Sequence, residues 1–120
     1  MEEEIKEELK KYLPEGKIKW VRELERYYVF RYVVRGRSYI GSALKDEDGD
    51  WVIILRKGIG DCGIIYIDGD WSLNVLSRIP ATDFEQALGW LQYSFNPFFN
   101  ADEREYISPA CYNYNGRFRY

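Results

Sequence analysis

The sequence predicts an α+β domain in which an antiparallel meander sheet of about five or six strands is flanked by an N-terminal and a C-terminal helix. An irregular, aromatic-rich tail follows the second helix. Two short segments have apolar residues at helical spacing, and the chain between them alternates apolar and polar residues between glycine- and aspartate-rich turns. The length of 120 residues predicts a single domain covering residues 1–120.

The first helix is predicted over Glu2–Leu13. Glutamates crowd its first turn and lysines its last, as the helix macrodipole favours, and the segment 14–16 (Pro-Glu-Gly) ends it. An apolar stripe with helical spacing supports this assignment and consists of Ile5, Leu9, Tyr12 and Leu13.

Strands are predicted over Lys17–Leu24 and Arg26–Arg35. The spacing of Trp20, Leu24 and Tyr28 also fits a helix, but the run of β-branched and aromatic residues favours strands. The second strand mixes arginine and valine on one face, which indicates a central strand with one face buried and the other partly covered. Its other face is entirely apolar and consists of Tyr28, Phe30, Tyr32 and Val34.

Arg35 and Gly36 form the predicted two-residue loop of a hairpin whose return strand is Arg37–Lys45. This loop sets the register, so that Tyr32 faces Tyr39 and Phe30 faces Gly41. An aromatic ring lying over a strand glycine is a common cross-strand pairing. Three more strands are expected after the turns DEDGD, GIGDC and DGD, at Trp51–Lys57, Gly63–Asp68 and Trp71–Val75.

A capping box at Thr82-Asp83-Phe84-Glu85 predicts the start of the second helix. Asn96 and Pro97 end it. Its apolar stripe consists of Phe84, Ala87, Leu88, Leu91 and Phe95. The tail has no long periodic element, and its aromatic content favours packing against the body of the domain over disorder.

The composition excludes several kinds of chemistry. The chain has no histidine, which removes Ser–His–Asp and Cys–His catalytic systems and histidine-containing zinc sites, and its two cysteines cannot complete an all-cysteine zinc site. We therefore expect no catalytic residues, no metal site and no cofactor. The net charge of −3 gives no strong attraction to nucleic acid or membrane. Two cysteines do not make a disulfide framework, which favours a cytoplasmic protein, and the longest apolar runs are too short to span a bilayer, which favours a soluble one.

The stretch RKGIGDCGIIYIDGDW contains a complete G-x-G-x-x-G at Gly58, Gly60 and Gly63. In a dinucleotide site the third glycine begins a helix, whereas Gly63 precedes the strand-like IIYI, so a glycine-rich hairpin loop is the better interpretation. Cys62 lies within this loop beside Asp61, which opposes thiolate formation, and it has no histidine base. We do not expect it to be a nucleophile.

Asp46, Asp48 and Asp50 resemble the opening of a calcium loop. An EF-hand then needs glycine at position 6 and glutamate at position 12, where this chain has Trp51 and Lys57. The DGDW tetrapeptide occurs twice, and turn formation ahead of an aromatic strand start explains both copies.

Two groups of residues are the candidate partner-binding site. Arg31, Arg35 and Arg37 share the polar face and loop of the central hairpin in this interpretation, and arginine suits phosphate, carboxylate and aromatic contacts. The tail adds residues of the types that dominate protein–protein contacts, namely Tyr112, Tyr114, Arg117, Phe118 and Arg119.

The leading hypothesis is a small non-enzymatic binding protein that acts through protein–protein interaction, as an inhibitor or adaptor. The second is a single-stranded nucleic-acid-binding protein that uses the same arginine and aromatic surface. The third is a small enzyme that uses carboxylates without histidine. A homodimer is a further option, and no membrane partner is expected.

Overall fold

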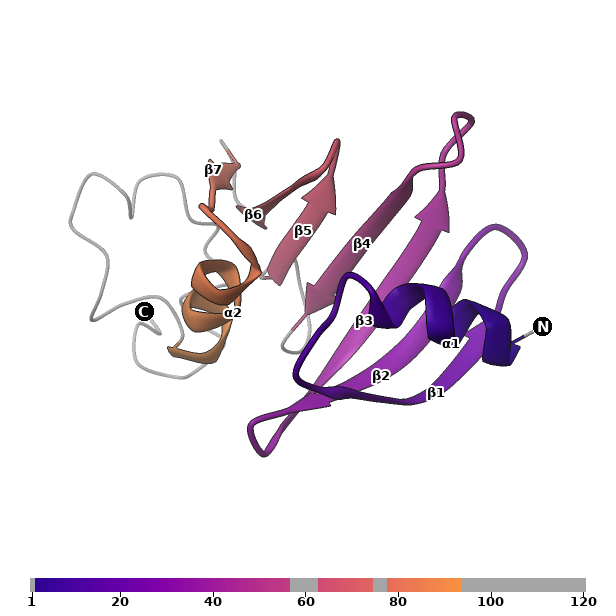
Figure 1. Ribbon diagram of the computed structural model, residues 1–120, viewed down its shortest axis with the longest axis horizontal. Helices are drawn as coiled ribbons and strands as arrows, with labels where there is room; N and C mark the ends of the chain where they lie inside the picture. Colours follow the sequence, from indigo (N-terminus) through magenta and orange to yellow (C-terminus); the bar gives the residue numbers. More distant parts are fainter. Residues whose placement is uncertain (1, 57–62, 75–77, 94–120) are drawn as a thin grey trace, which may run out of the picture.

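The computed structural model describes residues 2–56, 63–74 and 78–93 of the chain (Figure 1). A seven-stranded antiparallel meander, in which every strand pairs with its neighbour in sequence, forms one layer. The α+β prediction is confirmed. The elements are α1 (Glu2–Lys10), β1 (Lys17–Glu23), β2 (Tyr28–Val34), β3 (Arg37–Lys45), β4 (Trp51–Arg56), β5 (Gly63–Ile67), β6 (Asp70–Asn74), β7 (Ile79–Pro80) and α2 (Phe84–Tyr93).

The central hairpin has the predicted register. Tyr32 pairs with Tyr39 and Phe30 with Gly41 across β2 and β3. Arg35 and Gly36 have φ values of 52° and 76°, the positive values that a type I′ turn requires at both central positions. A Cβ at Gly41 would overlap the Phe30 ring, so the glycine is what lets this ring lie flat across β3.

Two details of the sheet differ from the prediction. The seventh strand, β7, was not predicted, because two residues are too few to show an alternating pattern and one of them is Pro80. In β1 the pairing shifts between Ile18 and Trp20, so Lys19 is an extra residue in a β-bulge. The bulge changes which face the next residues occupy.

The start of α2 also differs by one residue. Asp83, rather than Thr82, is the N-cap, because its Oδ1 accepts a hydrogen bond from the Gln86 N–H at 2.9 Å. Gln86 Oε1 in turn accepts from the N–H of Thr82 at 2.9 Å, so a contact like that of a capping box is present but reaches back to the residue before the cap. The prediction placed the box one residue too early because Thr82 and Asp83 are both good caps.

Both helices pack on the same face of the sheet (Figure 1). Phe84 of α2 contacts the rings of Tyr32 and Trp71, with centroid distances of 6.4 and 5.0 Å, and Glu8 of α1 accepts a hydrogen bond from Trp51 Nε1. We call this side the covered face. Its fully buried strand residues include Phe30, Tyr32, Ile53, Leu55, Ile64 and Leu73.

The apolar stripes of the helices complete the core. Ile5, Leu9 and Leu13 are buried, and the Leu13 N–H still bonds to the Leu9 carbonyl at 3.1 Å although α1 ends at Lys10. The predicted stripe of α2 is buried from Phe84 to Leu91, and Phe95 lies outside the described residues. Neither helix among the described residues is long and apolar enough to cross a bilayer.

Candidate functional site

Arg35 lies at the tip of the β2–β3 hairpin and joins three segments on the covered side. Its Nη2 donates to the Glu15 carboxylate at 2.9 and 3.1 Å and to Glu85 Oε2 at 2.6 Å, while Nη1 donates to Gln92 Oε1 at 3.3 Å. These bonds, to Glu85 first and then to Glu15, raise the pKa of Arg35. A hydrogen bond with Glu15, and then one from Arg35, lower the pKa of Glu85.

Arg37 has a related position at the other end of α2. Its Nη1 donates to the backbone carbonyl of Gln92 at 2.7 Å. Carbonyls in the last turn of a helix have no partner within the helix, and the helix dipole favours a cation there. Arg35 and Arg37 therefore tie the hairpin to α2, a contact within the chain that the sequence did not indicate.

Arg31 lies on the opposite face from these two residues. It pairs with Ile40 across β2 and β3, its Nη1 donates to Ser38 Oγ at 2.9 Å, and its guanidinium carbon lies 6.0 Å from the centroid of the Trp20 ring. The structure thus separates the three arginines that the sequence analysis grouped together. Strand alternation places Arg31 away from the helices, and the hairpin tip places Arg35 beside them.

The other predicted residues are not all described. Tyr112, Tyr114, Arg117, Phe118, Arg119, Cys62 and Cys111 lie outside the described residues, as do Gly58 and Gly60. Gly63 is the first residue of β5, so the third glycine of the motif begins a strand as predicted. A dinucleotide site would need a helix at this point.

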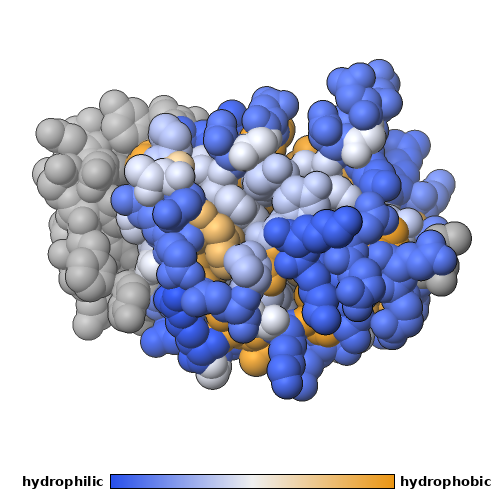
Figure 2. Space-filling view, in the orientation of Figure 1, coloured by the Kyte–Doolittle hydropathy of each residue, from blue (hydrophilic) through white to orange (hydrophobic). Residues whose placement is uncertain are grey.

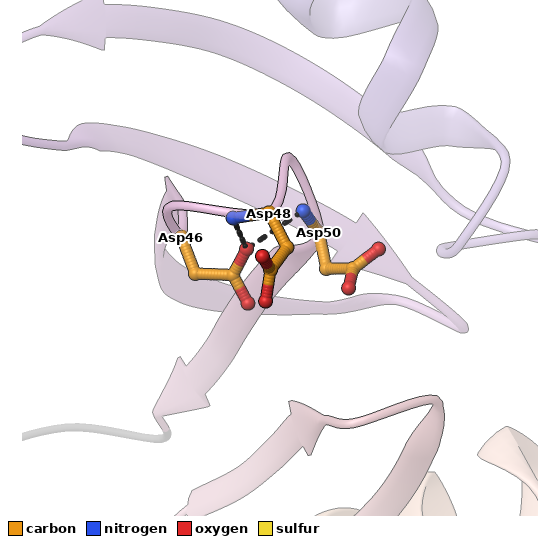
Figure 3. Close-up of side chains that lie close together, drawn as sticks. All are labelled: Asp46, Asp48 and Asp50. Atoms are coloured by element: carbon orange, nitrogen blue, oxygen red, sulfur yellow. Dashed lines mark hydrogen bonds between the residues drawn. The ribbon is translucent and has the colours of Figure 1, made fainter.

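The three aspartates of the β3–β4 turn lie close together (Figure 3). Asp46, Asp48 and Asp50 are all exposed, and their carboxylate oxygens lie within 4.8 Å of one another. Asp46 Oδ1 accepts hydrogen bonds from the backbone N–H groups of Asp48 and Asp50, both at 2.9 Å. This is an aspartate-capped turn closed by Gly49 at φ 84°, and turn formation accounts for the arrangement.

The side of the sheet away from the helices is unusually apolar for a face that no other element of the described chain covers. We call it the open face, and it looks away from the viewer in Figure 1. In most antiparallel sheets such a face carries polar residues. Here one cross-strand row reads Arg22, Val29, Ser42, Ile54 and Ile65, and the next reads Trp20, Arg31, Ile40 and Arg56.

A third row extends the open face to the end of the sheet. Leu44 pairs with Val52, and a hydrogen bond of 2.8 Å from the Leu24 N–H to the Tyr27 carbonyl continues the β1–β2 pairing beyond the strands. Continuing the register places Tyr27 opposite Leu44. The four large hydrophobic residues that are most exposed in the described chain therefore share this face, namely Trp20, Leu24, Tyr27 and Leu44, each 38–40% exposed.

On β1–β5 the open face carries charge of one sign, and Asp70 in β6, opposite Ile67, is the first carboxylate beyond these strands. Arg22, Arg31 and Arg56 project from this face, and the open-face positions of β1–β5, all within the described residues, hold no carboxylate. The acidic residues of α1 lie on the other side of the molecule. The guanidinium carbon of Arg22 lies 5.5 Å from the centroid of the Trp20 ring, so two arginines bracket the exposed indole.

Trp20 is the site residue that the sequence analysis missed. Regular alternation would place it on the same face as Ile18, among the buried residues. The bulge at Lys19 instead pairs Trp20 with Arg31 and returns Val21 to the covered face opposite Phe30. The signal in the sequence is the spacing of three between Ile18 and Val21, which a regular strand cannot bury on one face.

Comparison of the chain with protein-family models, curated proteins and solved structures gives no significant match. The function must therefore be argued from the geometry of the open face and its surroundings.

Proposed function

We propose that this protein is a non-enzymatic binding module whose open face is covered, in use, by an apolar surface of a partner protein with acidic residues around it. The single observation that supports this most is that the four most exposed large hydrophobic residues of the described chain group on the sheet face that the helices leave bare. A sheet buries an apolar face against another layer, and the partner would supply that layer.

Strand propensity alone does not explain the composition of this face. Solvent-facing strand positions readily take threonine, which has the β-branched shape without the apolar surface. This chain has a single threonine, Thr82, and it precedes a helix. The open face instead carries Ile40, Ile54 and Ile65, each half-buried. The choice of isoleucine at these positions favours a surface that is buried in a complex.

The charges favour an acidic partner. Arg22, Arg31 and Arg56 surround apolar residues and have no carboxylate among their open-face neighbours in β1–β5. Complementary charge accelerates encounter and sets orientation, and arginine and tryptophan are the residue types most enriched at binding hot spots. A single-stranded nucleic acid, by contrast, is tracked by a continuous basic groove, whereas aliphatic side chains occupy the middle of this face.

The proposal includes the absence of catalysis and a cytoplasmic location. The missing histidine supports the former, and the two cysteines, too few for a disulfide framework, support the latter. Burial, followed by the charges of Tyr12, Asp50 and Asp70, raises the pKa of Tyr66, so this phenol is a poor acid near neutral pH.

The test begins with a matched pair of double variants. Arg22→Glu/Arg31→Glu reverses two charges on the open face, and Lys6→Glu/Lys11→Glu makes the same charge change on the helix side. The tagged wild-type protein and both variants are used to capture partners from nuclease-treated extract of the native host. We expect a stoichiometric protein that binds the wild type and the helix-side variant and is lost from the open-face variant.

The captured protein is then produced alone and titrated into isoleucine-methyl-labelled binding module. The methyl signals of Ile40, Ile54 and Ile65 should shift, whereas those of Ile53 and Ile64 on the covered face should not. Equal binding to both variants, or shifts confined to covered-face methyls, contradicts the proposal. Nucleic acid recovered from untreated extract, with affinity falling steeply with salt, would replace it with the nucleic-acid function, and a concentration-dependent dimer in light scattering would replace it with self-association.

A further inference from the structure

A cleft of about 440 Å³ opens on the helix side of the molecule, away from the open face. It lies between the turn that follows α1, the start of β4 and the final residues of β5. Figure 2 shows weakly polar and apolar surface in the strip between the two helices, bordered by strongly hydrophilic residues. The residues that line the cleft are Tyr12, Asp50, Trp51, Tyr66, Asp68 and Gly69.

Three of the six lining residues are aromatic. The rings of Tyr12 and Tyr66 lie with their centroids 5.0 Å apart and their planes inclined by 55°. Tyr66 also contacts Trp71, at 5.4 Å between centroids, so its ring is held by two aromatic neighbours. An aromatic ring that borders a cleft offers the negative face of its π system to an alkylammonium group there.

Two carboxylates border the same cleft. Asp50 lies at the end of the β3–β4 turn, and Asp68 lies in the β5–β6 turn with φ 53° beside Gly69 at φ 91°. Within the described part of the chain, neither carboxylate takes part in an ion pair. The negative charge at the rim is therefore available to a ligand. Burial first, and then the charges of Tyr12, Asp50 and Asp70, raise the pKa of Tyr66.

The chain already shows the same recognition chemistry at the edge of the cleft, on the ring of Trp51 itself. Lys45 Nζ lies 5.3 Å from the centroid of the Trp51 ring and 3.2 Å from Glu8 Oε1. An aromatic ring and a carboxylate thus hold an alkylammonium group beside the cleft. A hard metal ion is a poorer fit, since calcium takes six to eight oxygen ligands and half of this lining is aromatic.

We propose that the cleft of Tyr12, Trp51 and Tyr66 binds an organic cation, either an alkylammonium or an alkylguanidinium group, with Asp50 and Asp68 compensating its charge. Free small molecules and the lysine or arginine side chains of a protein both offer this group. The cleft is independent of the open face, so this inference stands or falls separately from the proposed function.

The experiment is a titration of the purified full chain, followed by amide NMR, with choline and with its uncharged carbon isostere 3,3-dimethylbutan-1-ol. We expect saturable shifts at the cleft residues with choline at roughly millimolar affinity, and at least tenfold weaker binding of the isostere. Equal affinity for the two probes shows an apolar cleft and overturns the proposal, as does the absence of any saturable shift up to about 100 mM choline.

Variants locate the site. Asp68→Asn keeps a residue type that tolerates positive φ and removes the charge, and Tyr12→Leu keeps an apolar wall and removes the ring. Each should weaken choline binding by about three- to tenfold. Asp48→Asn makes the same charge change in the neighbouring turn but does not line the cleft, and it should alter the affinity less than about twofold. An equal effect of Asp48→Asn would reduce the binding to general charge attraction and overturn the site.

Two more probes distinguish the source of the cation. The amides of N-acetyl-trimethyllysine and N-acetylarginine present the group as a peptide side chain does, and N-acetylnorleucine amide is their uncharged control. Tighter binding of either cationic amide than of choline assigns the site to a side chain of a partner protein. Tighter binding of choline assigns it to a free small molecule.

Discussion

The two faces of the sheet carry similar numbers of aliphatic side chains but differ in how deeply these side chains are buried. On the covered face, residues such as Ile53 and Leu55 are fully buried beneath α1 and α2. On the open face, their sequence neighbours Ile54 and Val52 are only half-buried, and arginines stand among them. The sequence of β4 is therefore typical of a strand buried on both faces, although the described chain covers only one of them.

The sharpest test of this comparison uses adjacent residues of β4. Ile53→Ala should lower the free energy of unfolding by about 3–4 kcal/mol, because it leaves a cavity in the core. Ile54→Ala should lower it by about 1 kcal/mol or less, since little surface is buried there. Both changes lose the same strand propensity, so the difference reports burial. Urea denaturation measures both values, and equal losses would show that the open face is already covered within the chain.

The glycine pair Gly41 and Gly89 tests the packing of the covered face. Gly41→Ala places a Cβ into the ring of the fully buried Phe30 and should destabilise by about 2–3 kcal/mol. Gly89 lies in α2, and an added Cβ there meets nothing within 4 Å. Gly89→Ala should therefore stabilise by up to about 1 kcal/mol, the difference in helix propensity. Thermal unfolding of both variants checks the contrast, which fails if the two alanines have effects of the same sign.

Much of the covered face could be predicted from the sequence, because its causes are local. The Arg35–Gly36 turn sets the β2–β3 register, and the register alone brings Phe30 over Gly41. Helical spacing likewise identified Leu9 and Leu88 as buried residues. In these places the pattern of the chain and the packing of the fold give the same answer.

The candidate site could not be predicted in the same way, because its causes are not local. A single extra residue at Lys19 moves Trp20 to the open face, and the spacing of three between Ile18 and Val21 does not by itself show which residue between them is the extra one. Arg31 and Arg35 are separated by the sheet, although the sequence places them four residues apart. Which face the helices cover depends on tertiary packing, so the sequence did not indicate which apolar residues would remain exposed.

A buried hydroxyl group joins the covered face to the α1–β1 loop. The phenol of Tyr32 donates to the Pro14 carbonyl at 2.6 Å and accepts from the Gly16 N–H at 3.2 Å. Tyr32→Phe leaves both backbone groups without this partner and should cost about 1–2 kcal/mol. A comparable hydroxyl on the open face, Ser42, is half-buried, and Ser42→Ala should cost less. Chemical denaturation of both variants at pH 7 provides the measurement.

The burial of the Tyr32 phenol also leads to a prediction for the free energy of unfolding at alkaline pH. Burial raises the pKa of Tyr32 from 10.0 to about 12. The unfolded chain therefore loses this proton at lower pH than the native protein does. The stabilisation is fully present below pH 10 and is lost as the pH rises toward 12. Tyr32→Phe should make the unfolding free energy less sensitive to pH in this window, and an unchanged alkaline slope would contradict the burial of the hydroxyl.

The smallest expected effect compares an arginine on each side of the sheet. Hydrogen bonds with Glu15 and Arg35 lower the pKa of Glu85 from its ordinary value of 4.5, so the native state releases this proton more readily than the unfolded chain. The contribution of Glu85 to stability is thus present above about pH 4.5 and is lost as the pH falls through the lowered value.

Glu85→Gln and Arg35→Gln should each flatten the acid limb of the stability curve. Arg31→Gln should leave that limb unchanged, because Arg31 contacts the hydroxyl of Ser38 and the ring of Trp20, neither of which titrates in acid. If Arg31→Gln flattened the limb as well, a carboxylate would have to lie against Arg31, and the one-signed charge of the open face on β1–β5, on which the proposed acidic partner depends, would be wrong.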